Sequence, residues 1–262
     1  MRDPHVESLR YRLKTSATTI YKNPPAVKFT RNEFECYLKD GVLTCRMREH
    51  FPTVEEAQRV VEDFLHSWEI KTALELRRGA MKFQFEDSHV IDRNPPPPGS
   101  SEFNYVSNSG GLKFTGSVTS IHSITLREYP DSPIDFTVTP DVETLWQRYN
   151  NYLDGKEPLP AMAYFCLTLI ENKAGGKKKR ESAAKLFLID EEILSMLGNL
   201  TTNRGDPKTA RKVPEKGKNM IALRNNEEKW IKAAVKILIR RMGELANIQA
   251  PKLISMNDLP KI

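Results

Sequence analysis

The fold is decided first by residues 34–47, which read FECYLKDGVLTCRM. Asp40-Gly41 at its centre is the signal of a two-residue type I′ turn, because both central positions of that turn need a positive φ. Folding the chain there sets a register in which apolar residues share one face and opposite charges share the other. The apolar face carries Phe34, Cys36, Leu38, Leu43, Cys45 and Met47. The stretch therefore predicts a β-hairpin with one buried face.

Cys36 and Cys45 face each other in this register, where they could form a disulfide, a redox switch or half of a metal site. We expect two reduced thiols that pack as small apolar side chains, because the expected compartment is reducing. The sequence has no Cys-x-x-Cys or His-x-x-x-His spacing of the kind that binds zinc. No metal and no cofactor is therefore predicted.

Outward from the hairpin, residues 1–140 predict an α+β domain. Thr53 and Glu56 form a capping box, and apolar residues then recur at helical spacing as far as Trp68. This pattern predicts a helix over residues 54–68. We expect that helix to pack on one face of a sheet of about five mostly antiparallel strands.

The remaining strands of this domain are predicted from alternating apolar and polar residues. They are expected over residues 81–86, 117–127 and 134–138, with one or two more within residues 6–29. Between them, residues 91–116 contain the polyproline run Pro95–Pro98 and predict a long surface loop.

The second half predicts a helical bundle over residues 141–246 and a tail over residues 247–262. The expected helices cover residues 140–153, 161–172, 181–188, 190–197 and 225–245. The second of these is apolar nearly all round, which is typical of a central helix. Asn225 with Glu228 resembles a capping box that opens the last helix, and Trp230 belongs to the buried stripe of that helix.

The two predicted domains also differ in net charge. Residues 1–140 carry 18 Lys and Arg against 19 Asp and Glu, whereas residues 141–262 carry 22 against 15, so the net charge of +6 belongs to the second half. All five histidines precede residue 141. No apolar run reaches the roughly 18 residues of a membrane span, and the first residues lack the apolar core of a secretion signal. We expect a cytoplasmic protein of two domains that does not contact a membrane.

The richest polar stretch of the basic half is residues 201–212. Its side chains that could hold an anion are Asn203, Arg204, Lys208, Arg211 and Lys212. Arginine forks suit phosphate or carboxylate groups. The alternative is a structural connection in which Asp206 pairs with Arg204 or Arg211 and caps a helix.

A second basic run follows the central helix. It consists of Lys177, Lys178, Lys179 and Arg180. Such a run could bind an acidic partner or nucleic acid, and the alternative is a solvated loop. It lacks the interleaved aromatic residues of a platform for single strands.

No catalytic residue is predicted. The sequence contains no nucleophile elbow, phosphate loop or dinucleotide fingerprint. The five histidines form no cluster in the sequence, and His66 and His122 are expected to serve packing or a sheet edge.

Residues 141–245 resemble HEPN-type proteins, which are helical modules of bacterial toxin and defence systems. The resemblance rests on the order of helices and on a polar motif at Arg204 that precedes the last long helix. It implies an all-α HEPN-like bundle. Many of those proteins are metal-independent ribonucleases that use an Arg and, four to six residues later, a His. In this chain that histidine would fall at Thr209, Ala210 or Arg211, and none of them is histidine.

Residues 197–212 are also similar to a segment of bacterial proteins labelled as methylamine-utilization J-type. Three functional hypotheses follow. The first is a non-catalytic bacterial accessory protein whose basic bundle binds an acidic partner, either an acidic protein or RNA. The second, implied by the HEPN resemblance, is a ribonuclease of a toxin or defence system. The third, implied by the other similarity, is an accessory protein of methylamine utilization. A homodimer through the helical bundle is a further expectation.

Overall fold

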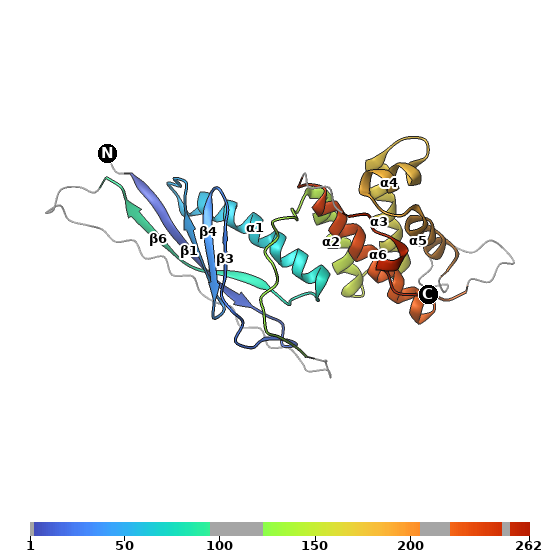
Figure 1. Cartoon of the computed structure of the whole chain (residues 1–262), viewed down its shortest axis with the longest axis horizontal. Helices are drawn as coiled ribbons and strands as arrows, with labels where there is room; N and C mark the ends of the chain where they lie inside the picture. Colours follow the sequence, from blue (N-terminus) through green and yellow to red (C-terminus); the bar gives the residue numbers. More distant parts are fainter. Residues whose placement is uncertain (1–2, 95–122, 205–220, 248–251) are drawn as a thin grey trace. The chain divides into compact units, whose positions relative to one another are not determined.

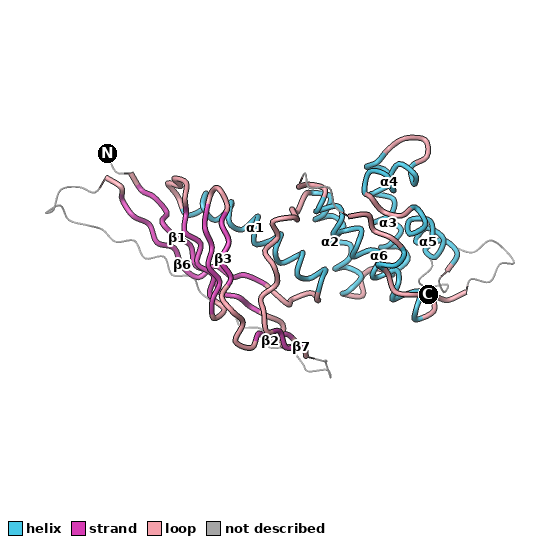
Figure 2. Tube along the Cα trace, in the orientation of Figure 1, coloured by secondary structure: helices cyan, strands magenta, loops and turns pink. Residues whose placement is uncertain are grey.

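The computed structural model describes residues 3–94, 123–204, 221–247 and 252–262, and the chain divides into two compact units, residues 1–133 and 134–262. Among the described residues, every named strand lies in the first unit, and five of the six α-helices lie in the second (Figures 1 and 2). The predicted α+β class, with an amino-terminal antiparallel sheet and a carboxy-terminal helical region, is confirmed. The sequence placed the boundary at residue 140, whereas the first unit ends at Pro133.

The sheet unit is built on five strands in the order β3-β4-β5-β1-β6, and each neighbouring pair is antiparallel. Their bounds are β1 Pro4–Lys14, β3 Val27–Thr30, β4 Phe34–Lys39, β5 Val42–Met47 and β6 Lys82–Asp92. A separate pair of short parallel strands consists of β2 (Thr19–Tyr21) and β7 (Ile124–Leu126). The segment before the hairpin thus supplies three strands, whereas the sequence predicts one or two.

The predicted hairpin register is confirmed in full. Phe34 lies opposite Met47, and Glu35 lies opposite Arg46. Asp40 and Gly41 form the turn with φ values of 50° and 73°, in the region that the type I′ turn requires. The predicted apolar face is buried.

Helix α1 (Val54–Glu75) packs on that apolar face (Figure 1). The Thr53 side chain accepts a hydrogen bond from the backbone N–H of Glu56, as the capping box predicts. The helix continues beyond Trp68 because Ile70 and Leu74 extend its buried stripe. One face of the sheet is therefore covered by a single helix.

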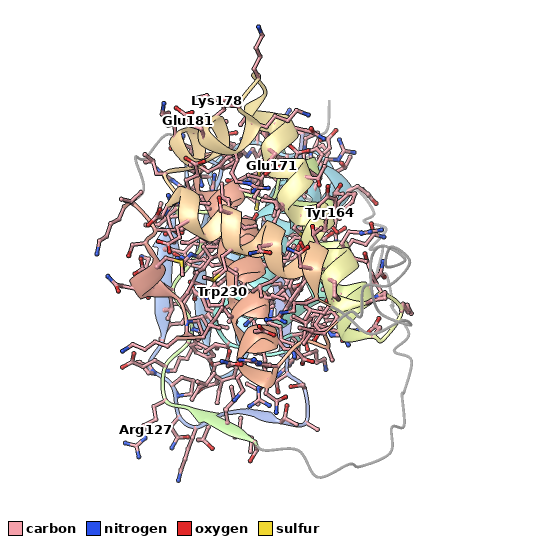
Figure 3. The ribbon with its side chains drawn as sticks, turned by 90° about the vertical axis from the view of Figure 1, so that its right-hand side faces the viewer. Arg127, Tyr164, Glu171, Lys178, Glu181 and Trp230 are labelled. Atoms are coloured by element: carbon pink, nitrogen blue, oxygen red, sulfur yellow. A yellow bond between two sulfur atoms is a disulfide. The ribbon has the colours of Figure 1, made fainter. Side chains whose placement is uncertain are left out.

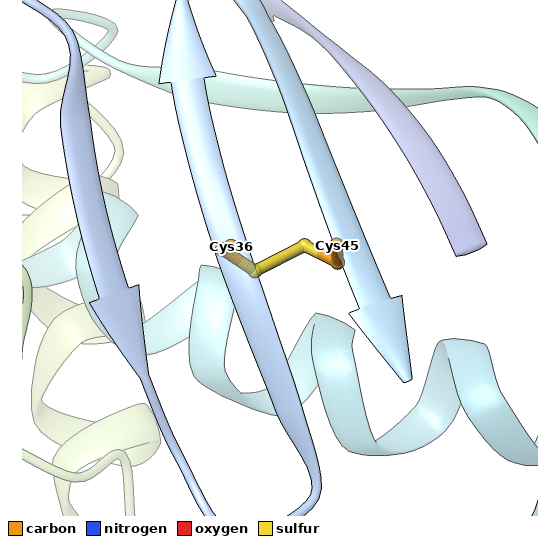
Figure 4. The surroundings of a disulfide bond; sticks show 2 residues. All are labelled: Cys36 and Cys45. Atoms are coloured by element: carbon orange, nitrogen blue, oxygen red, sulfur yellow. A yellow bond between two sulfur atoms is a disulfide. The ribbon is translucent and has the colours of Figure 1, made fainter. Parts of the chain in front are cut away.

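Cys36 and Cys45 form a disulfide (Figure 4), so the expectation of reduced thiols is wrong. Their Cα atoms lie 4.2 Å apart because the two residues are directly opposite on antiparallel strands, where a non-hydrogen-bonded pair brings side chains closest. Both side chains are fully buried. The predicted register correctly placed the two cysteines opposite each other. Their redox state was predicted wrongly because a reducing compartment was assumed.

Thiol counting tests this disulfide. In denaturant without reductant we expect one reactive thiol per chain, from Cys166, which is the free cysteine of the structure. Reduction should raise the count to three. It should also lower the free energy of unfolding by about 2–3 kcal/mol, because the bond closes a short loop in the unfolded chain. Three reactive thiols before reduction would contradict the disulfide.

The strand predicted over residues 134–138 is wrong. This segment is not a strand, and Phe136 packs in the helical unit, where it is buried. A Cβ atom added to Gly243 of helix α6 would lie 2.3 Å from the Phe136 ring, so glycine permits this close contact. Alternation of apolar residues cannot distinguish a strand from an extended segment that inserts one aromatic ring. The predicted loop over residues 91–116 begins too early, because Ile91 and Asp92 belong to strand β6. Residues 95–116 of this loop and residues 117–122 of the predicted 117–127 strand lie outside the described residues.

The helical unit contains five helices. Their bounds are α2 Pro140–Leu153, α3 Leu159–Ala174, α4 Lys179–Phe187, α5 Glu191–Asn203 and α6 Asn225–Glu244. Helix α3 packs against all four others, as expected from its nearly continuous apolar surface. The N-cap residue of helix α6 is Arg224, one residue earlier than predicted, and its backbone N–H donates to the Glu227 carboxylate. Within the described parts of the chain, no helix is long and apolar enough to span a membrane.

Helix α5 continues six residues past the predicted end at Leu197. Gly198 lies inside the helix, at a point where side chains of two other helices approach the backbone closely. A Cβ atom at this position would lie 2.8 Å from the guanidinium of Arg180 and 3.3 Å from Leu167. The glycine thus permits close packing within the helix and does not end it.

The tail predicted over residues 247–262 is also corrected, because its described part packs on the helical unit. Ile254 and Leu259 are buried, and Ile254 forms a β-bridge with Ile189. The bridge consists of two backbone hydrogen bonds, from the N–H of Ile254 to Leu188 and from the N–H of Asp190 to Ile254. Two apolar residues among polar ones were too weak a signal for sequence analysis to predict this docking.

Candidate anion-binding site

The predicted basic run lies where helix α3 ends and helix α4 begins. Gly175 and Gly176, with φ values of 67° and 80°, separate α3 from the lysines. We call Lys177, Lys178 and Lys179 the lysine loop. All three are exposed, and 82% of the Lys178 side chain is accessible to solvent. Lys178 and Glu181 lie together at one edge of the helical unit (Figure 3).

Two side chains of the lysine loop already contact acidic or amide groups of the same unit. Lys178 Nζ lies 3.1 Å from a carboxylate oxygen of Glu181, which also pairs with Lys185 at 2.7 Å. Hydrogen bonds from Lys185 and Lys178 lower the pKa of Glu181. Lys179 donates to the Asn172 side chain at 2.7 Å. These contacts are exposed and screened by solvent, so they stabilise the fold little and can be exchanged for an external anion.

Arg180 differs from the three lysines because it has a structural role. Its Nε atom donates to Glu171 of helix α3 at 2.9 Å, and the Glu171 side chain is only 17% exposed. Its guanidinium also lies against Gly198 of helix α5. Arg180 thus links three helices and contributes less to an external site than the sequence predicts.

Arg204 is likewise engaged within the fold. It lies at the end of helix α5, and its Nη2 atom is 3.1 Å from a carboxylate oxygen of Glu227 at the start of helix α6. The Glu227 side chain is 4% exposed and also accepts the backbone N–H of Arg224 at 2.8 Å. Arg204 therefore neutralises a buried carboxylate, which restricts its use for a second anion.

Of the other predicted residues in the 201–212 stretch, only Asn203 is described. Asn203 donates to the side chain of Asn199, one helical turn earlier. Lys208, Arg211 and Lys212 lie outside the described residues. The structure therefore places the lysine loop as a group, but it does not bring that group together with Arg204.

Sequence reasoning missed the acidic partners of the basic residues. Glu181 lies three residues after Lys178 and four before Lys185, which is the helical spacing for ion pairs and could have been recognised. The pairing of Arg204 with Glu227 joins two helices and has no such local signal. Nowhere in the described residues do three His, Cys, Asp or Glu side chains form a group that could hold a metal ion.

Comparison with known proteins adds no relative, since neither a protein-family model nor a curated protein nor a solved structure matches the chain. The functional interpretation therefore rests on the charges and contacts of this chain alone.

Proposed function

We propose that this chain is a non-catalytic accessory protein whose helical unit binds an acidic partner through the lysine loop. The observation that carries the proposal is the position of three consecutive exposed lysines at a helix junction. Six cations lie in or beside the loop, and they are Lys173, Lys177, Lys178, Lys179, Arg180 and Lys185. Three carboxylates pair with them, those of Asp141, Glu171 and Glu181. The local surface therefore keeps a positive charge that attracts an acidic segment.

An acidic protein segment suits this loop better than RNA. The residues from Gly175 to Ser182 include no aromatic side chain, so the loop offers no surface on which a base could stack. Ammonium groups act as flexible point charges and accept carboxylates in many orientations. Binding at such a site would depend on the charge of the partner and would have low specificity for its sequence.

The described geometry gives the ribonuclease alternative no support. An arginine that stabilises a scissile phosphate must be able to reach the phosphate, whereas Arg204 is held by Glu227. A proton-transfer group with a pKa near neutrality is also required, and no histidine follows residue 122. We therefore retain the binding function and use RNA as a comparison ligand.

A binding assay tests the proposal with the full chain. A fluorescent peptide of about ten glutamates is titrated with protein at low salt, and anisotropy reports binding. Replacing Lys177, Lys178 and Lys179 by alanine should weaken binding at least about fivefold, because three charge contacts are lost. The affinity of the wild-type protein should fall as salt is added.

The matched control removes three lysines elsewhere in the same unit. Lys229, Lys252 and Lys261 are exposed, so their replacement by alanine changes the net charge equally. If both triple variants lose the same affinity, attraction is general and the lysine loop is not a site. If the lysine-loop variant loses more affinity for an RNA strand than for the peptide, the assignment of an acidic protein partner to this loop is overturned, and strand cleavage would overturn the non-catalytic assignment.

A further inference from the structure

The second surface of interest is the outer face of the five-stranded sheet, which is the face opposite helix α1. It carries Tyr37, a tyrosine that is 43% exposed. The strand register places Lys28 on one side of Tyr37 and Thr44 on the other, and Arg10 lies beyond Thr44 on β1. One row across four neighbouring strands thus combines an aromatic ring, a hydroxyl group and two cations.

A shallow hollow of about 380 Å³ opens at this row. It is lined by Lys28, Glu35, Tyr37, Thr44 and Arg46. Lys28 Nζ lies 2.6 Å from a carboxylate oxygen of Glu35, and this contact lowers the Glu35 pKa. Arg10 and Arg46 are exposed; Arg46 lies opposite Glu35 and helps to lower its pKa, and Arg10 lies opposite Asp87 of β6. Of the side chains that line the hollow, two are cations, Lys28 and Arg46, and one is a carboxylate, Glu35. The hollow therefore keeps a positive charge beside its aromatic ring.

These chemical groups match the parts of a nucleotide. An exposed tyrosine ring on a rigid strand provides a flat surface for a base, and stacking of this kind tolerates any base. Arginines at the edge of the hollow suit phosphates, which they bind through two parallel hydrogen bonds. An acidic protein segment would gain from the arginines but would leave the tyrosine unused.

We propose that the outer face of the sheet binds single-stranded RNA, with one base stacked on Tyr37 and backbone phosphates beside Arg46 and Arg10. An unpaired strand is required, because a base within a duplex does not expose its ring face. Glu35 and Thr44 line the hollow and can accept a hydrogen bond from a ribose 2′-hydroxyl, which DNA lacks. The site lies in the sheet unit and does not depend on the lysine loop.

Anisotropy with the full chain and a fluorescent oligouridine of about ten nucleotides tests this site. Replacing Tyr37 by threonine, which keeps a strand-forming residue but removes the ring, should weaken binding at least about fivefold. Tyr37→Phe keeps the ring and should change the affinity less than about twofold. Tyr37 is exposed, so both variants should fold, and circular dichroism verifies this.

A salt titration separates stacking from charge. Arg46→Ala should reduce the slope of log affinity against log salt by about 0.7, because one phosphate contact is lost, whereas Tyr37→Thr should leave that slope unchanged. The alanine variant of the lysine loop should bind the oligouridine like the wild type, which distinguishes this site from the proposed function. Equal affinities of Tyr37→Thr and Tyr37→Phe, absence of binding at low salt, or equal affinity for oligothymidine DNA would each overturn the proposal.

Discussion

Replacing Arg241 by methionine is expected to lower the free energy of unfolding of the helical unit by about 3–5 kcal/mol. Arg241 is 2% exposed and lies on helix α6. Its Nη1 atom donates to the carbonyl oxygens of Phe187 and Leu188 at 2.7 and 3.0 Å, and its Nη2 atom donates to that of Lys252 at 2.6 Å. Methionine fills a similar volume but removes this donor from the carbonyl oxygens of Phe187 and Lys252, whereas the Leu188 oxygen still accepts the N–H of Ile254. A buried acceptor that loses its donor costs more free energy than the net gain of forming the hydrogen bond.

Urea unfolding followed by circular dichroism measures this loss. Arg240→Ala is the matched control, because Arg240 is the adjacent residue and pairs with the same acid, Glu244, but its side chain is 38% exposed. It should cost no more than about 1 kcal/mol. Arg241→Met should also speed amide hydrogen exchange at Ile254, since Arg241 holds the segment that contains it. Equal effects of the two substitutions would show that Arg241 is not the link that docks this segment.

Local patterns predicted the parts of the fold that depend on neighbouring residues. The hairpin follows from Asp40-Gly41 and strict alternation, so its register was predictable to the residue. The start of helix α1 follows from Thr53 and its capping partner. Both signals lie within a few residues of the structure that they specify, and a single sequence contains all the information that they need.

The errors arose where a residue acts on a distant part of the chain. Gly198 and Gly243 make room for Arg180 and Phe136, so their role is visible only once the packing is known. Arg241 looks in the sequence like one more cation on a helix, yet it is buried by residues over 50 positions away. The sequence shows the same residue type whether a glycine or an arginine lies at the surface or packs against distant residues. Only the tertiary contacts distinguish these two roles.

The candidate site shows the same division. The sequence correctly predicted an exposed group of lysines, because a run of like charges has no buried alternative. It could not predict that Arg204 is held by Glu227, since the two residues meet only when helices α5 and α6 pack. The outer face of the sheet was implicit in the hairpin register, which places Tyr37 opposite Thr44. Its basic neighbours became visible only when β1 and β3 were placed beside the hairpin.

The second large effect is expected for Trp230→Ala, which should destabilise the helical unit by about 3–5 kcal/mol. Trp230 has no exposed surface and belongs to the buried stripe of helix α6, with Ile231, Ala234 and Leu238. Truncation removes the indole and leaves a cavity that the surrounding helices fill only in part. A loss of this size is a large fraction of the 5–15 kcal/mol that stabilises a typical domain. Urea unfolding followed by circular dichroism measures it.

Trp230→Phe is the informative control, because the indole Nε1 of Trp230 is buried and has no hydrogen-bond partner among the described residues. Phenylalanine keeps most of the ring contacts and removes this unsatisfied donor, so the two effects oppose each other. We expect the loss to be no more than about half of that for alanine. A fluorescence spectrum of Trp230, recorded with Trp68 and Trp146 replaced by phenylalanine, should show the short-wavelength emission of a buried indole. Emission typical of water, together with a small effect of Trp230→Ala, would show that the buried face of helix α6 is assigned wrongly.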